Sequence, residues 1–156
     1  MTLNNGWKKM LVLSVSVVLF AASSCDDDDE DEIKTQYNIS GNATGAQEVP
    51  PVNTPATGTL TGTYNSATNV LTYSISWTGL TGAPTMMHFH GPAGVGEINS
   101  PIVHITGYPQ QTTGTVSGTA NVEESMEQDL LNERWYYNLH TPTHGGGEIR
   151  AQVLID

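Results

Sequence analysis

The stretch Met86-Met87-His88-Phe89-His90-Gly91 predicts an extended strand with two different faces. Side chains at positions i and i+2 of a strand lie on the same face. His88 and His90 therefore point one way, while Met87 and Phe89 point the other. Two imidazoles on one face, about 6.5–7 Å apart along the strand, can converge on one ion or on one small polar ligand.

The segments around this strand also alternate with a period of two. The clearest is residues 71–78, where apolar Leu71, Tyr73, Ile75 and Trp77 alternate with Thr and Ser. Strands are expected over residues 35–44, 56–64, 71–78, 85–90, 101–106, 112–121, 135–140 and 148–155, with one short helix over residues 122–132. Short strands separated by regularly spaced turns predict an all-β fold, an antiparallel Greek-key β-sandwich or barrel.

Together with the other histidines of the chain, the pair His88 and His90 can be interpreted as a metal site. Three neutral imidazoles suit copper or zinc, and His88, His90 and His140 are the first choice because His90 and His140 precede Gly/Pro loops. His104 and His144 are possible additional ligands. The other interpretation stays open: strand histidines also hydrogen-bond backbone carbonyls or carboxylates and hold loops in place.

Two further groups of residues each have a structural and a functional interpretation. Glu148 and Arg150 share one face of the last expected strand, so an ion pair is expected, although Arg150 could instead steer an anion towards a metal. Four aromatic side chains could form a carbohydrate-stacking platform, but at strand spacing we expect them to pack in the core and at its rim; they are Trp77, Trp135, Tyr136 and Tyr137.

The composition narrows the classes of function. The chain has 156 residues and a formal net charge of −11. Such an acidic chain offers no basic patch for phosphates, so a nucleic-acid partner is not expected. No Ser-His-Asp order, phosphate-binding loop or cysteine nucleophile stands out. These observations favour a non-enzymatic protein that binds a metal ion, a small ligand or a surface partner.

The N-terminal residues are typical of an export signal. Residues 1–24 contain Lys8 and Lys9 followed by a short apolar run, and Ala22-Ser23-Ser24 precede Cys25, the only cysteine. This pattern resembles a bacterial lipoprotein signal, which implies that Cys25 is acylated, for example with palmitate, and anchors the protein to a membrane. A plain secretory signal followed by a free thiol is the alternative.

Seven consecutive acidic residues, 26–32, follow Cys25. Such a run is typical of a solvated spacer, so residues 25–34 are interpreted as a tether and residues 35–156 as the folded domain. Acidic residues after a lipidated cysteine also resemble a surface-export signal. The expected location is therefore the outer membrane of the cell envelope, surface-exposed, with the periplasmic face as the alternative.

Four motifs together resemble the CHRD domain, named after the repeats in chordin. They are Gly45-Ala46-Gln47-Glu48-Val49-Pro50-Pro51, His88-Phe89-His90-Gly91-Pro92-Ala93, Trp135-Tyr136-Tyr137-Asn138-Leu139-His140-Thr141 and Gly147-Glu148-Ile149-Arg150-Ala151-Gln152-Val153. The resemblance covers residues 36–155 and departs from the usual pattern at Leu139 and Ala151. It implies an extracytoplasmic β domain, found in bacterial secreted or anchored proteins, and no particular activity.

A second likeness concerns the layout of Cu/Zn superoxide dismutase, a Greek-key sandwich. His88, His90, His140 and Arg150 occur in a comparable order, whereas the zinc-bridging and disulfide residues have no clear counterpart. The likeness makes a copper-dependent redox enzyme the alternative to a binding module. A purely structural or adhesive surface module, in which the histidines only tie loops together, is the third possibility.

Overall fold

The computed structural model describes Met1, Thr2 and residues 34–156. The predicted signal peptide beyond Thr2, the lipidation site Cys25 and the acidic run lie outside the described residues. Residues 33–156 form a compact unit. Within the described part of the chain, no helix is long and apolar enough to cross a membrane.

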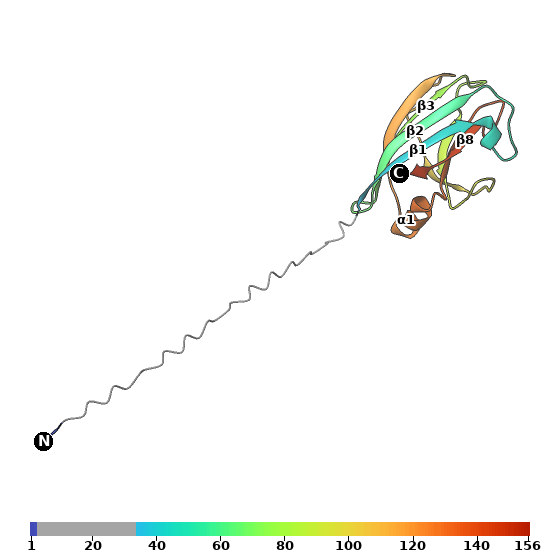
Figure 1. The fold of residues 1–156 in the computed structure, drawn as a ribbon. Helices are drawn as coiled ribbons and strands as arrows, with labels where there is room; N and C mark the ends of the chain where they lie inside the picture. Colours follow the sequence, from blue (N-terminus) through green and yellow to red (C-terminus); the bar gives the residue numbers. More distant parts are fainter. Residues whose placement is uncertain (3–33) are drawn as a thin grey trace. The chain divides into compact units, whose positions relative to one another are not determined.

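The regular secondary structure of the domain is almost entirely β-strand, with one short α-helix (Figure 1). Its elements are β1 (Gln36–Thr44), the 3-10 helix η1 (Gly45–Gln47), β2 (Thr57–Asn65), β3 (Val70–Thr78), β4 (Met86–His90), β5 (Pro101–His104), β6 (Gly114–Asn121), α1 (Glu124–Leu131), β7 (Tyr136–His140), β8 (Ile149–Gln152) and β9 (Leu154–Ile155). The all-β prediction and the single short helix are confirmed, and the short η1 is an element that the sequence pattern did not indicate.

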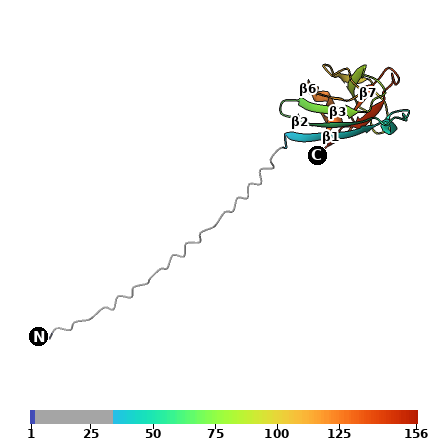
Figure 2. The same ribbon diagram turned by 90° about the horizontal axis from the view of Figure 1, so that it is seen from above.

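The strands form one antiparallel sheet that curves into a nearly closed barrel (Figures 1 and 2). The strand order is β5-β4-β7-β8-β1-β2-β3-β6, and β9 pairs with β1 beside this path. The sequence predicted either a β-sandwich or a β-barrel, and this single curved sheet corresponds to the barrel. The order brings β4 and β7 together from distant parts of the sequence, which is what places the two histidine-bearing strands side by side.

The core lies inside the curve of the sheet, where alternate residues of each strand point. In β3, Leu71, Tyr73, Ile75 and Trp77 are buried, as the period-two pattern predicts. The aromatic residues considered as a stacking platform are at most 3% exposed: Trp77, Trp135, Tyr136 and Tyr137. Trp77, Trp135 and Tyr137 belong to the core, whereas Tyr136 is buried against His90 on the other face of the sheet, so none of the four forms an exposed platform.

The last expected strand is divided into β8 and β9. At Val153 the pairing with β7 ends, because β8 pairs with both β7 and β1 whereas β9 pairs with β1. The Val153 N–H donates to the Trp135 carbonyl between the two strands. The pattern over residues 148–155 predicted the extended conformation but not this division, since alternation reports only which face is buried.

Candidate metal centre

The histidine cluster lies on the face of the sheet opposite the core. His88 is directly opposite Asn138 across the β4–β7 pair, and directly opposed residues share a face. His90 and His140 follow at i+2 on their own strands and therefore lie on the same side. Although this is the outer face of the barrel, each of these four side chains is at most 7% exposed.

Loops cover this part of the outer face, and two of them supply acceptors to the histidines. His90 donates through Nδ1 to the Asn99 carbonyl (2.8 Å), and His140 donates through Nδ1 to the Gly145 carbonyl (3.0 Å). Both loops are thereby tied to imidazoles. A cluster on an outer face becomes buried because the chain folds back over it.

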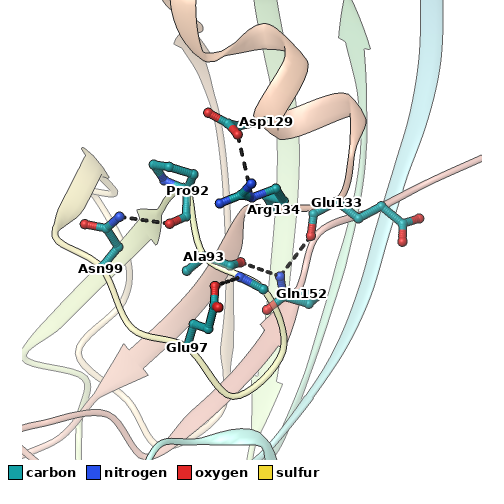
Figure 3. A network of polar contacts seen from close by, with 9 residues as sticks. Pro92, Ala93, Glu97, Asn99, Asp129, Glu133, Arg134 and Gln152 are labelled. Carbon is teal, nitrogen blue, oxygen red and sulfur yellow. Dashed lines mark hydrogen bonds and ion pairs between the residues drawn. The ribbon is translucent and has the colours of Figure 1, made fainter.

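The loop that carries Asn99 is itself held by a network of polar contacts (Figure 3). The Asn99 side chain donates to the Pro92 carbonyl (2.8 Å), which closes the loop on itself. Gln152 of β8 donates to the carbonyls of Ala93 and Glu133, each at 2.9 Å. These contacts fix the carbonyl that orients His90, an arrangement that is usual for the outer shell of a metal site.

Three imidazole nitrogens converge closely enough to share one ion. One ring nitrogen from each of His88, His90 and His140 lies within 4.8 Å of the others. The ring of His88 is 5.4 Å from that of His90 and 5.1 Å from that of His140, centre to centre. Donor atoms around a tetrahedral ion with bonds near 2.0–2.1 Å are roughly 3.4 Å apart, so small movements of these rings suffice.

The protonation of these rings leaves lone pairs facing one another. A carbonyl can only accept, so Nδ1 of His90 and of His140 carries the proton, and Nε2 of each neutral ring is an acceptor. Both Nε2 atoms lie 3.0 Å from Oδ1 of Asn138, which is also an acceptor. Three acceptors facing one another without a donor are repulsive, and a bound cation removes the repulsion.

Burial keeps the three rings neutral, which is the form that binds metals. It lowers the pKa of His88 to about 4, with further lowering by the neighbouring histidines. Burial also lowers the pKa of His90 and of His140, although their hydrogen bonds oppose the shift. In addition, Nδ1 of His88 is buried without a hydrogen-bond partner. The cluster therefore consists of uncharged, electron-pair-donating groups at neutral pH.

Arg150 does not pair with Glu148, so the predicted ion pair is wrong. The guanidinium carbon of Arg150 lies 3.5 Å from the centre of the Tyr136 ring, and Tyr136 stacks on His90 at 4.5 Å with planes 4° apart. Arg150 also donates to the Gly94 carbonyl and to Gln152. Arg150 thus holds Tyr136 in place, and the Tyr136 ring in turn stacks on His90.

Glu148 instead joins three loops through hydroxyl groups. Its carboxylate accepts from the hydroxyls of Thr54 (2.8 Å), Thr81 (2.7 Å) and Thr141 (2.7 Å), and from the Thr81 N–H (2.9 Å). Burial alone would raise the pKa of Glu148, but these hydrogen bonds lower it overall. Glu148 is therefore a buried carboxylate that hydroxyl and amide donors stabilise without a cation, and it precedes β8 rather than belonging to it.

Glu48 lies on the other side of Asn138 from the histidines. It is 6% exposed, and its Oε1 has no hydrogen-bond partner. Burial raises the pKa of Glu48 to about 7, although the charge of Arg150 and a hydrogen bond from Asn138 oppose the shift. Glu48 therefore orients the Asn138 amide, so that its nitrogen faces Glu48 and its oxygen faces the histidines.

Glutamine in place of Glu48 is expected to stabilise the metal-free protein at alkaline pH. A carboxyl whose pKa is raised from 4.5 to about 7 contributes stability below pH 4.5 that is lost as the pH rises through 7. Glu48→Gln removes this loss, so its advantage should grow from nothing near pH 4.5 to roughly 3 kcal/mol above pH 7. Urea unfolding at several pH values, with chelator present, measures it; a constant difference across this range would contradict the expectation.

Gly147 allows the close approach of Glu48 and Asn138. Its φ is +128°, and a Cβ there would overlap Oε1 of Glu48 and lie 2.8 Å from Nδ2 of Asn138. We expect Gly147→Ala to lower the free energy of unfolding by about 1–3 kcal/mol. Gly146→Ala is the matched control, because a Cβ at Gly146 meets nothing within 4 Å. Equal unfolding midpoints for the two variants would contradict this account.

The remaining histidines lie at the margins of the cluster. The ring of His104 contacts that of His88 at 4.7 Å, edge to face, and lines the same cavity. His144 lies on the turn after β7 and is outside the three-histidine group. It lines a separate cavity of about 280 Å³ with Glu48 and the Gly145–Gly147 turn.

Asn138 is the residue of the cluster that the sequence analysis did not single out. It precedes His140 by two residues, as His88 precedes His90, so the same alternation places it on the histidine face. That spacing was an available signal. The carbonyls of Asn99 and Gly145 had no signal, because backbone acceptors become specific only when the loops take their positions.

A nearly closed β-barrel with a buried histidine cluster is consistent with a binding module. The model of one protein family, described as the CHRD domain, matches residues 39–153. The match covers most of the chain, and the chain belongs to the CHRD-domain family. Neither a search of curated proteins nor a search of solved structures found a match to the chain.

Proposed function

We propose that this CHRD-domain protein binds a transition-metal ion, copper or zinc, at the cell envelope and is not an enzyme. The ligands are His88, His90 and His140, and Oδ1 of Asn138 is the fourth donor. One observation carries the proposal: Nε2 of His90, Nε2 of His140 and Oδ1 of Asn138 approach to 3.0 Å with no donor among them. Imidazole nitrogen suits both metals, so the donor set alone does not choose between them.

A metal-free arrangement competes with this proposal. If the Asn138 amide turns by half a rotation, its nitrogen donates to both Nε2 atoms and its oxygen accepts from a protonated Glu48. The raised pKa of Glu48, about 7 because of its burial, favours this arrangement at acid pH. In that case the histidines only hold loops together, as in the structural-module hypothesis.

Metal analysis distinguishes the two arrangements. Purified residues 33–156 are dialysed against equimolar copper or zinc at neutral pH, and the bound metal is counted for each chain. We expect one ion per chain, lost in the double variant His88→Ala/His90→Ala and retained in His144→Ala, which removes a histidine outside the cluster. If the wild type binds no stoichiometric metal, or the double variant binds as much, the metal proposal fails.

The redox-enzyme alternative receives less support from Arg150. Steering a small anion to a metal needs an accessible positive charge, whereas Arg150 is 2% exposed and stacks on Tyr136. In residues 33–156, three basic residues face nine acidic ones. A superoxide turnover assay on the copper-loaded domain tests this alternative directly, and we expect no activity above that of free copper.

The envelope location rests on the N-terminal sequence. An acylated Cys25 followed by the acidic run 26–32 would hold the domain at the outer membrane, facing outward. Labelled palmitate should be incorporated into the wild type and not into Cys25→Ala, and protease added to whole cells should digest the domain. Digestion only after the outer membrane is opened would instead indicate the periplasmic face.

A further inference from the structure

A cavity of about 570 Å³ lies beside the histidine cluster. His88 and His104 form its polar end, and Met86, Ile105 and Tyr108 contribute apolar wall. This volume is in the range of pockets that hold small organic molecules. The cavity lies against the metal candidate itself, so its walls restrict what can approach the cluster.

The walls of this cavity carry no formal charge. Its lining, taken over the described residues, contains no Lys, Arg, Asp or Glu. The imidazoles of His88, His90 and His140 also line it. In the metal-free protein, an ionised molecule that entered would lose hydration without gaining a counter-charge, whereas an uncharged apolar molecule would gain by leaving water.

The polar side chains of the lining are four histidines, whose rings lie close together, and those of Thr106 and Tyr108. The Tyr108 hydroxyl already donates to the Thr85 carbonyl (2.9 Å), so the apolar end has no free donor from this residue. The His88 side chain is only 6% exposed, and its Nδ1 has no hydrogen-bond partner. The polar requirement of a ligand is therefore met at the histidine end.

We propose that the cavity binds a small, uncharged, largely apolar molecule whose single polar group faces the imidazoles of His88 and His104. This inference goes beyond the proposed function, because the cavity is present whether or not the cluster holds an ion. The occupant is a small molecule, since the volume suits one and the histidines lie together on one side of the cavity. The apolar body contacts Met86, Ile105 and Tyr108.

Calorimetric titration of the purified chain with 4-methylphenol tests the proposal. This probe is uncharged at neutral pH and has one hydroxyl on an apolar ring; benzoate, of similar size but anionic, is the comparison. In the metal-free protein, we expect one saturable site for 4-methylphenol and at least tenfold weaker binding of benzoate. No saturable binding of 4-methylphenol, or equal affinity for the two probes, would overturn the proposal.

Two variants locate the binding in this cavity. Met86→Glu places a charge on the wall and Thr106→Trp fills space, and both positions are exposed enough to tolerate replacement. Each should weaken 4-methylphenol binding at least tenfold. Ile98→Glu adds the same charge at a residue that is 70% exposed and outside the lining, and should leave binding unchanged. Wild-type affinity in both cavity variants would overturn the proposal.

The titrations are run on metal-free and on zinc-loaded samples, with bound zinc counted in each. Binding of 4-methylphenol without stoichiometric zinc would support the ligand class and reject the metal proposal. Stoichiometric zinc without 4-methylphenol binding would support the metal proposal and reject the ligand class. The two failures are therefore distinguishable in one set of samples.

Discussion

Zinc at a thousandfold excess over its dissociation constant is expected to stabilise the domain by about 4 kcal/mol, since an ion that binds only the folded state shifts the unfolding equilibrium. For a domain of this size, the thermal midpoint should rise by roughly 10–20 °C. The physical reason is the group of facing lone pairs on His90, His140 and Asn138, which a cation joins and unfolding separates. Scanning calorimetry with and without zinc measures the shift.

Removing one ligand should remove most of this stabilisation. Loss of an outer-shell partner already weakens metal binding about 10–100-fold, so His90→Ala is expected to weaken it by at least about 100-fold. The same zinc concentration would then stabilise the variant by only about 1.4 kcal/mol or less. His144→Ala should show the full wild-type shift, because His144 lies outside the cluster. Equal shifts in the two variants would mean that zinc binds elsewhere.

Alanine in place of Glu148 is expected to cost about 2–4 kcal/mol of unfolding free energy. The change removes the common acceptor of three threonine hydroxyls, of which Thr141 is fully buried, Thr54 is half-buried and Thr81 is exposed. A buried polar group left without a partner costs about 1–3 kcal/mol, whereas an exposed hydroxyl can bond water instead. The loss is a large part of the stability of an ordinary domain, about 5–15 kcal/mol.

Two comparisons test whether hydrogen bonding causes this loss. Glu148→Gln keeps one acceptor oxygen, and hydroxyls can also accept from its amide, so it should lose about half as much. Glu97→Ala removes a carboxylate that accepts only an exposed N–H bond, from Gly94, and should change stability by less than about 1 kcal/mol. Circular dichroism during urea unfolding compares the three. A Glu148→Ala variant as stable as Glu97→Ala would contradict the role given to Glu148.

Most of the strand pattern could be predicted from the sequence, because alternation directly reflects a two-faced sheet. The expected 71–78 and 85–90 segments correspond to β3 (Val70–Thr78) and β4 (Met86–His90) within one residue. The prediction that His88 and His90 share a face is confirmed, and His140 lies close to both. Strand pairing, however, decides which segments become neighbours, and alternation carries no information about it.

The error at Glu148 shows the limit of the same reasoning. Glu148 and Arg150 are two residues apart, but the strand begins only at Ile149, after Gly147 with a φ of +128°. Outside the strand the i, i+2 rule does not apply. The carboxylate reaches threonines from three separate loops instead. Partners that come from distant loops have no local signal in the sequence.

Anomalous diffraction from zinc-loaded crystals would locate the ion itself. We expect one strong zinc peak with bonds of about 2.0–2.1 Å to one nitrogen each of His88, His90 and His140, and with Oδ1 of Asn138 as the fourth ligand. Zinc peaks only at surface carboxylates or at His144, with Asn138 turned to donate to both histidines, would contradict the metal proposal.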